Sequence, residues 1–98
     1  VHTMKIGVLK IEMYISWSKS LKDKRSEVNR IISKVQNKFK ITIAQVDGLD
    51  KLQSIVLGAA LISNEISHLD QMMDKVLNFI EEIINGEIIT IEREIMKG

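Results

Sequence analysis

The sequence has no cysteine and no proline, and its aromatic residues are limited to one tryptophan, one tyrosine and two phenylalanines. Without cysteine, the protein has no disulfide scaffold, no thiolate metal site and no cysteine nucleophile. The lack of proline, together with only five glycines, argues against linkers and low-complexity segments. A chain of 98 residues also leaves room for only one domain, which excludes a multidomain enzyme.

Long hydrophobic runs are missing as well. A membrane-spanning helix needs roughly 18 to 20 consecutive apolar residues, and no stretch comes near that length. The apolar run over residues 6–15 is interrupted by Lys10 and Glu12, so we expect no signal peptide. These absences predict a cytoplasmic protein with no membrane partner. We place its single domain at residues 4–97 and expect residues 1–3 to be a remnant of cloning.

The apolar residues that are present follow two kinds of spacing. Alternation with period two is typical of half-buried strands, and it occurs in residues 5–15, 40–47, 51–63 and 87–96. Helical spacing occurs from residue 21 to about 39 and from residues 64–67 to about 84. The order strand, helix, strand, strand, helix, strand predicts an α+β fold of the ferredoxin-like βαββαβ type. In that sandwich, a four-stranded antiparallel sheet carries two helices on one face.

Short polar motifs mark where these elements begin and end. Ser20, three residues before Asp23, has the form of a capping box for the first helix. Asp47-Gly48 predicts the turn of a hairpin. Asn85-Gly86 predicts the end of the second helix, with the glycine in the left-handed conformation.

Both faces of the third predicted strand carry apolar side chains. They are Val56, Ala60 and Ile62 on one face and Ile55, Leu57 and Leu61 on the other. Because two helices on one side cover only one face, the open face needs a second cover. We expect self-association into a homo-oligomer through this face. The alternative is that strand curvature and the chain termini shield it.

The net charge of +1 conceals an uneven distribution. Residues 19–40 contain eight Lys and Arg against two acidic residues, a net of +6, whereas residues 61–98 contain three against eight, a net of −5. A basic helix attracts polyanions because each phosphate that it neutralises releases counterions. The alternative is a solvated helix face that the acidic half balances. The candidate nucleic-acid-binding residues are Lys19, Lys22, Lys24, Arg25, Arg30 and Lys34.

The loop before the basic helix is a second candidate site. Ser16, Ser18 and Ser20 lead into a helix N-terminus, whose free N–H groups and positive dipole end favour an anion. We therefore predict an anion-binding loop at these three serines. The tryptophan of the same loop, Trp17, has three possible roles: to stack on a base, to fill an interface, or to close the end of the core, which is the expected one.

Arg25 has two open roles, as a contact residue or as a structural ion-pair partner. It lies four residues after Leu21 and three before Val28, on the apolar stripe of the helix. We expect its stem to be packed and its head group to pair with Asp47 or Asp50 of the hairpin.

The sequence offers no catalytic or cofactor motif. His68 has no second histidine or spaced set of acids near it, so no metal site is predicted. No serine has a partner histidine in a known arrangement, and no glycine-rich phosphate loop is present. The central strands lack the aromatic residues that an RNA-recognition motif uses for stacking. We expect a protein that is not an enzyme and that needs no cofactor or metal.

Several short motifs occur together in residues 4–96: Ser-Leu-Lys-Asp-Lys-Arg at 20–25, Asn-Lys-Phe at 37–39, Val-Asp at 46–47, Gln53 and Leu-Gly at 57–58. In these, the chain resembles the YlxP-like family of small bacterial proteins, catalogued as a domain of unknown function. The resemblance implies a ferredoxin-like fold. It also implies a ribosome-associated role, because genes of relatives often lie among those for translation initiation and ribosome maturation factors.

The chain departs from the family pattern in the hairpin. Many relatives have Glu-Val/Ile-Asp where this chain has Gln45-Val46-Asp47, and Leu-Trp-Gln-Arg where it has residues 51–54. The resemblance therefore supports a shared function only for the segment with Lys22, Lys24 and Arg25, where the family motif is intact. The expected function is a non-enzymatic accessory protein that binds ribosomal RNA or the small ribosomal subunit. The alternatives are a self-associating structural or regulatory module and a small-anion-binding regulatory domain.

Overall fold

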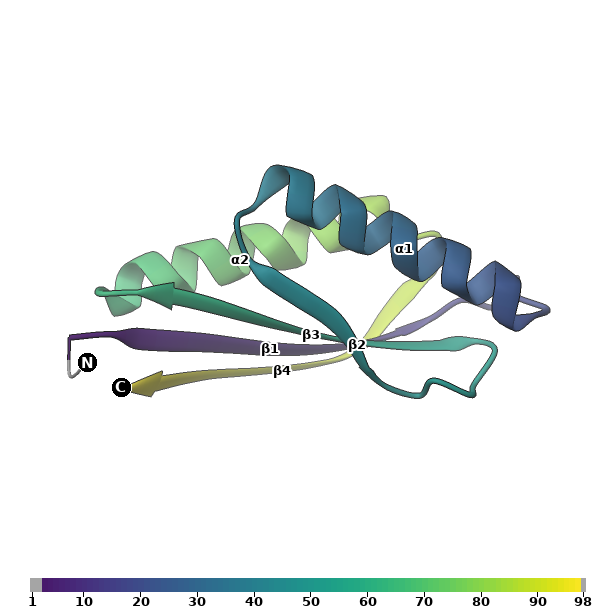
Figure 1. The fold of residues 1–98 in the computed structure, drawn as a ribbon, viewed down its shortest axis with the longest axis horizontal. Coiled ribbons are helices and arrows are strands. Elements are labelled where there is room, and N and C mark those ends of the chain that lie inside the picture. The colour runs from purple at the N-terminus through teal and green to yellow at the C-terminus, as the bar shows by residue number, and fades with distance from the viewer. Residues whose placement is uncertain (1–2, 98) are drawn as a thin grey trace.

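The computed structural model describes residues 3–97, so Val1 and His2 of the expected cloning remnant lie outside the described residues. The six predicted elements are present in the predicted order (Figure 1). They are β1 (Lys5–Tyr14), α1 (Leu21–Lys38), β2 (Thr42–Asp47), β3 (Ser54–Ser63), α2 (Ile66–Ile83) and β4 (Glu87–Lys97).

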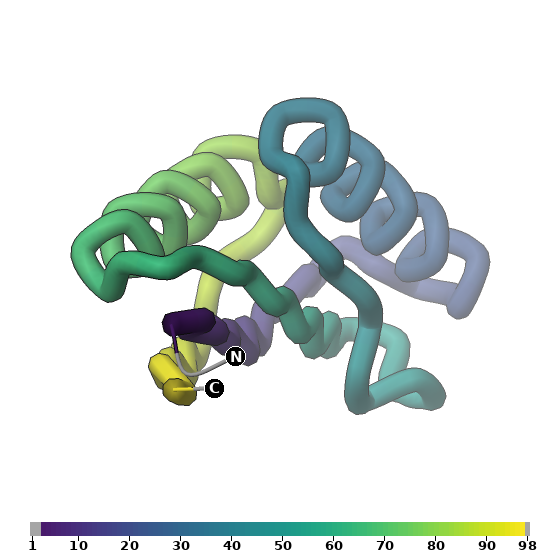
Figure 2. Tube along the Cα trace, turned by 60° about the vertical axis from the view of Figure 1, so that its left-hand side comes forward, coloured from purple at the N-terminus to yellow at the C-terminus, as the bar shows by residue number. Residues whose placement is uncertain are grey.

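The four strands form one antiparallel sheet in the order β2-β3-β1-β4. The two central strands pair along their whole length, from Lys5 opposite Ser63 to Tyr14 opposite Ser54. Both helices cover one face of this sheet, and the other face is bare (Figures 1 and 2). The predicted ferredoxin-like βαββαβ sandwich is confirmed.

The core lies between the helices and the covered face of the sheet. Strand alternation sends Leu9, Ile11 and Met13 of β1 toward the helices, where they are fully buried. The helices meet them with apolar stripes at three- and four-residue spacing, as amphipathic helices on a sheet must. These stripes are Val28, Ile31 and Val35 of α1 and Leu69, Met73, Val76 and Ile80 of α2.

The open face of the sheet carries the opposite parity of side chains. Ile62 of β3 is 68% exposed there, and Val46 of β2 and Met96 of β4 are exposed as well. Charged residues lie among them, since Lys10 of β1 forms an ion pair with Glu92 of β4. The prediction of an apolar open face therefore holds for part of this face, and the rest is charged.

Of the two helix ends that the sequence predicted, one is confirmed and the other is wrong. The capping box is confirmed: Ser20 Oγ accepts a hydrogen bond from the Asp23 N–H at 3.1 Å, and an Asp23 carboxylate oxygen accepts from the Lys19 N–H at 3.0 Å. The prediction that Gly86 ends the second helix in the left-handed conformation is wrong. Helix α2 ends at Ile83 with an extended cap residue, and Gly48 is the glycine with positive φ among residues 3–97.

Candidate functional site

Three connections of the chain meet at one end of the molecule, opposite the end that holds both termini (Figure 1). We call it the loop end. It consists of residues 15–20 before α1, the hairpin at 48–53 between β2 and β3, and the turn at 84–86 after α2. The Ser-Leu-Lys-Asp-Lys-Arg motif and Gln53 therefore lie together, although 28 or more residues separate them in the sequence.

The predicted anion-binding loop is not assembled as expected. Ser20 uses its hydroxyl to cap α1, and the buried Ser18 donates its hydroxyl to the Ser20 carbonyl at 3.2 Å. Only Ser16 is exposed. Because the Asp23 carboxylate already accepts from a backbone N–H at this helix N-terminus, an anionic ligand there meets a negative charge. The three serines do not form an anion site.

Lys24 is buried beneath the hairpin. Its side chain is only 2% exposed, and its ammonium donates to the carbonyl oxygen of Lys51 at 2.6 Å and to that of Gly48. Burial lowers the pKa of this ammonium below its ordinary value, against the opposing charge of Asp50. This corrects the prediction that Lys24 contacts nucleic acid, because a side chain so deeply buried is out of reach of a ligand.

Arg25 and Lys24 have exchanged the environments that the sequence predicted, because Arg25 is exposed and Lys24 is buried. Within residues 3–97, Arg25 forms no ion pair with Asp47 or Asp50. The stripe of α1 runs through Lys24, Val28 and Ile31, so the lysine occupies the inward position. The prediction of a packed and paired Arg25 is wrong by one residue, which on a helix is a rotation of about 100°.

Glu27 is a structural residue that the sequence analysis missed. It is 3% exposed and forms a two-point ion pair with Arg30, with distances of 2.9 and 2.7 Å. The same carboxylate accepts the Asn85 N–H at 3.0 Å, and Arg30 donates to the Ile83 carbonyl at 2.5 Å. These bonds fasten α1 to the end of α2. The spacing of Glu27 four residues before Ile31 was the available signal that it faces inward.

The pKa values of this pair follow from its contacts. Burial by itself raises the pKa of Glu27, but the hydrogen bonds from Arg30 and from Asn85 outweigh burial, and the pKa lies below its ordinary value. The hydrogen bond to Glu27 raises the pKa of Arg30. Arg30 is therefore held by its neighbours, and its guanidinium is only partly available to a ligand.

The remaining cations of the candidate set are all exposed. They are Lys19, Lys22, Arg25 and Lys34. The outward surface between them carries the neutral polar residues Ser26, Asn29, Ser33 and Gln36. Of the two acidic residues of this segment, Glu27 is buried, whereas Asp23 is partly exposed at the N-terminus of α1, where it accepts from the Lys19 N–H. We call this surface the basic face of α1.

The hairpin and the turn are tied to the loop that precedes α1. The Gln53 side-chain amide donates to the Ser16 carbonyl at 2.9 Å and to the Ser18 carbonyl at 3.3 Å. The indole N–H of Trp17 donates to the Asn85 carbonyl at 2.5 Å. Trp17 remains 42% exposed, so the expectation that it closes the core is only half met.

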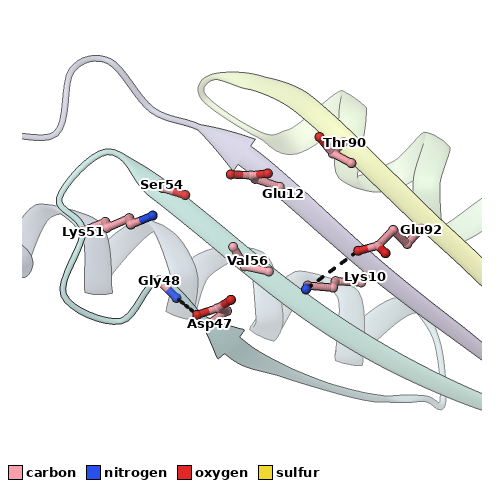
Figure 3. Close-up of a pocket in the computed structure, with 9 residues that line it drawn as sticks. All are labelled: Lys10, Glu12, Asp47, Gly48, Lys51, Ser54, Val56, Thr90 and Glu92. Carbon is pink, nitrogen blue, oxygen red and sulfur yellow. Dashed lines mark hydrogen bonds and ion pairs between the residues drawn. The ribbon is translucent and has the colours of Figure 1, made fainter.

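A second feature lies on the open face of the sheet, beside the hairpin. It is a hollow of about 120 Å³ with Val56 at its centre and charges of both signs around it (Figure 3). Lys10 and Lys51 contribute ammonium groups, and the three carboxylates come from Glu12, Asp47 and Glu92. Lys10 and Glu92 form an ion pair at 3.7 Å. In the part of the chain that the structure describes, no three His, Cys, Asp or Glu side chains converge as a metal site would need.

His68, the isolated histidine, lies at the start of α2, with its Nδ1 2.9 Å from the Ser63 hydroxyl. It is exposed and remote from the loop end. None of the helices in residues 3–97 combines the length and apolar character needed to cross a membrane.

A solved ACT domain from the GTP pyrophosphokinase of Chlorobium tepidum superimposes with a TM-score of 0.55 and 21% sequence identity, covering 94% of this chain and 88% of that one. At this identity, the likeness concerns the fold alone.

Sequence relatives are closer. The "Uncharacterized protein YlxP" of Bacillus subtilis (strain 168) is 34% identical over 76 residues, which cover 78% of this chain and 83% of that protein. The model of the family described as "Protein of unknown function (DUF503)" matches residues 6–93. The predicted YlxP-like resemblance is thus confirmed, and the chain belongs to the DUF503 family.

Proposed function

We propose that this protein is a non-enzymatic accessory protein that binds structured RNA of the small ribosomal subunit through the basic face of α1. One observation carries the proposal. The exposed cations of this face lie among neutral polar side chains, while the Glu27 carboxylate is buried and paired with Arg30 and the partly exposed Asp23 carboxylate accepts from the Lys19 N–H. A surface balanced by acids on the same helix would have left Glu27 beside the cations as well as Asp23.

The chemistry of the face suits a phosphate backbone. Lysine and arginine neutralise phosphates, and serine, asparagine and glutamine side chains also donate to phosphate oxygens. Such contacts position a protein on RNA by shape and charge, without reading base edges. Seven of the other acids lie on α2 and β4, at Asp70, Asp74, Glu81, Glu82, Glu87, Glu92 and Glu94, and the remaining four are Glu12 of β1, Asp47 at the end of β2, Asp50 in the hairpin and Glu65 before α2. This separation of charge orients the basic face toward a polyanion during approach.

Sedimentation with small ribosomal subunits tests the proposal. Wild-type protein is expected to pellet with the subunits, whereas the double variant Lys22→Gln/Arg25→Gln pellets to a much smaller extent. The matched control is Lys75→Gln/Lys97→Gln, which removes two exposed cations from α2 and β4 and is expected to pellet like wild type. Equal pelleting of both double variants, or no pelleting of wild type, contradicts the proposal.

Self-association through the open sheet face is the second candidate. It is favoured by the exposure of Ile62, Val46 and Met96 on that face. Sedimentation-velocity ultracentrifugation at roughly tens of micromolar (a concentration that detects interfaces of ordinary size) separates the two. A dimer that Ile62→Lys dissociates supports this candidate, and a strict monomer eliminates it.

A further inference from the structure

We infer that Trp17 is a stacking platform for an unpaired base of the bound RNA. The inference rests on the proposed function and deepens it, because it names the part of the RNA that the loop end recognises. The ligand is a nucleotide in a single-stranded loop or bulge, with its phosphates on the neighbouring cations.

The exposure of Trp17 is the first observation. Aromatic side chains of this size supply a large share of core burial, yet the indole keeps 42% of its surface exposed at the loop end. The two phenylalanines behave differently, since Phe39 and Phe79 pack edge to face with ring centroids 5.7 Å apart. Tyr14, at the end of β1, is also exposed, but its hydroxyl lies against Gln53 of the hairpin, so Trp17 is the exposed ring nearest in sequence to the cations of α1.

The orientation of the ring is the second observation. The indole N–H is bound to the Asn85 carbonyl at 2.5 Å, which ties the ring to the turn after α2. Holding the ring before the ligand arrives reduces the ordering cost of binding. The same bond uses the one donor of the indole. A base stacked on Trp17 is consequently held through its face, and recognition tolerates any base.

The third observation is the spacing between the ring and the cations. Lys19 follows Trp17 by two residues, and two residues span at most about 7 Å of chain. Lys22 lies in the first turn of α1, close behind. Base and phosphate of one nucleotide can therefore meet the indole and the ammonium of Lys19 or Lys22 together, with the Asp23 carboxylate as an opposing charge in the same turn. Leu21 at the start of α1 and the 67%-exposed Leu49 of the hairpin add apolar surface at the same end.

The single tryptophan makes the inference directly measurable by fluorescence. We titrate the protein with two RNAs of equal length, a hairpin with an unpaired loop and a fully paired duplex. The hairpin is expected to quench Trp17 fluorescence and to protect it from acrylamide, and the duplex to leave it nearly unchanged. Trp17→Ala is expected to weaken hairpin binding by about tenfold to a hundredfold, as removal of one stacked base does.

Trp17→Phe is the matched variant. It keeps a ring for stacking but lacks the N–H bond to Asn85, so its hairpin affinity is expected to lie between that of wild type and that of Trp17→Ala. If Trp17→Ala fails to fold, the quenching and the acrylamide protection of Trp17 in the wild-type protein carry the test. Salt-dependent RNA binding with unchanged Trp17 fluorescence and with equal affinity for hairpin and duplex overturns the inference and leaves the proposed function standing. Absence of any RNA binding by wild type overturns both.

Discussion

Lys24 and Arg25 are adjacent in the sequence and have opposite environments. The lysine is buried against two carbonyl oxygens of the hairpin, and the arginine is exposed on the basic face of α1. A buried ammonium is costly unless its protons are bound, so Lys24 acts as a clamp between α1 and the hairpin. The family motif therefore contains at least two kinds of residue, one that builds the loop end and one that presents charge.

The clamp predicts a stability difference within the motif. Lys24→Met leaves the Gly48 and Lys51 carbonyls without their donor and should lower the free energy of unfolding by about 1–3 kcal/mol, the cost of leaving buried acceptors unpaired. Lys22→Met, an exposed neighbour on the same helix, should change it by no more than about 0.5 kcal/mol. Urea denaturation of both variants measures this. Equal stabilities would show that the two carbonyls are solvated without Lys24.

Gly86 is required because the backbone of Tyr14 passes close to it, and not because its own backbone is left-handed. A Cβ at this position would lie 2.3 Å from the Tyr14 carbonyl oxygen, which is backbone and cannot turn aside. Gly86→Ala should therefore destabilise the protein by about 1–3 kcal/mol, as overpacking of a filled site does. The control is Gly7→Ala, where the nearest atom is the flexible Met73 side chain at 3.2 Å. Thermal melting should show a clearly larger drop for Gly86→Ala, and equal drops would refute the steric account.

At the scale of elements, the spacing of apolar residues was sufficient to predict the fold but not the side-chain contacts of the candidate site. The alternation in β1 and the stripe of α2 depend only on which residues are apolar, and these predicted the elements and their order. The start of β3 was placed three residues early, because residues 51–53 belong to the hairpin that Lys24 and Gln53 fasten. Contacts such as Glu27 to Asn85 join residues 58 positions apart. No local pattern encodes such a distance.

The bond network between α1 and the end of α2 predicts a dependence on pH. The folded-state pKa of Glu27 lies below its unfolded value, so the unfolded state binds the proton more readily in acid. The contribution of Glu27 to stability is therefore complete at neutral pH and is lost as pH falls from the unfolded pKa, about 4.3, through the lower folded one.

Glu27→Gln tests this dependence. The variant should be less stable than wild type at pH 7 by about 1–3 kcal/mol, with the difference shrinking as the pH is lowered toward 3. Urea denaturation across this pH range measures both proteins, and Glu81→Gln, an exposed acid on α2, should follow the wild-type curve. A constant gap between Glu27→Gln and wild type at every pH would contradict the assigned role.

For the whole molecule, the net charge of +1 is the sum of a basic segment at residues 19–40 and an acidic segment at residues 61–98. The sequence located the basic segment, and the structure reduced the candidate cations to those that are exposed, since Lys24 is buried and Arg30 is held by Glu27. The structure also removed Glu27 from the same surface, which the sequence could not do because burial depends on three-dimensional contacts. The loop end adds the exposed Trp17, two residues before Lys19, and the exposed Leu49 of the hairpin.

The salt dependence of RNA affinity tests the central claim most directly. The logarithm of the association constant should fall linearly with the logarithm of salt concentration, because phosphate contacts release counterions. For Lys22→Gln/Arg25→Gln the slope should be shallower than that of wild type by between about one and two units, roughly one per lost contact. The slope for Lys75→Gln/Lys97→Gln should match wild type. An affinity that does not fall with salt, or identical slopes for all three proteins, would contradict binding through the basic face of α1.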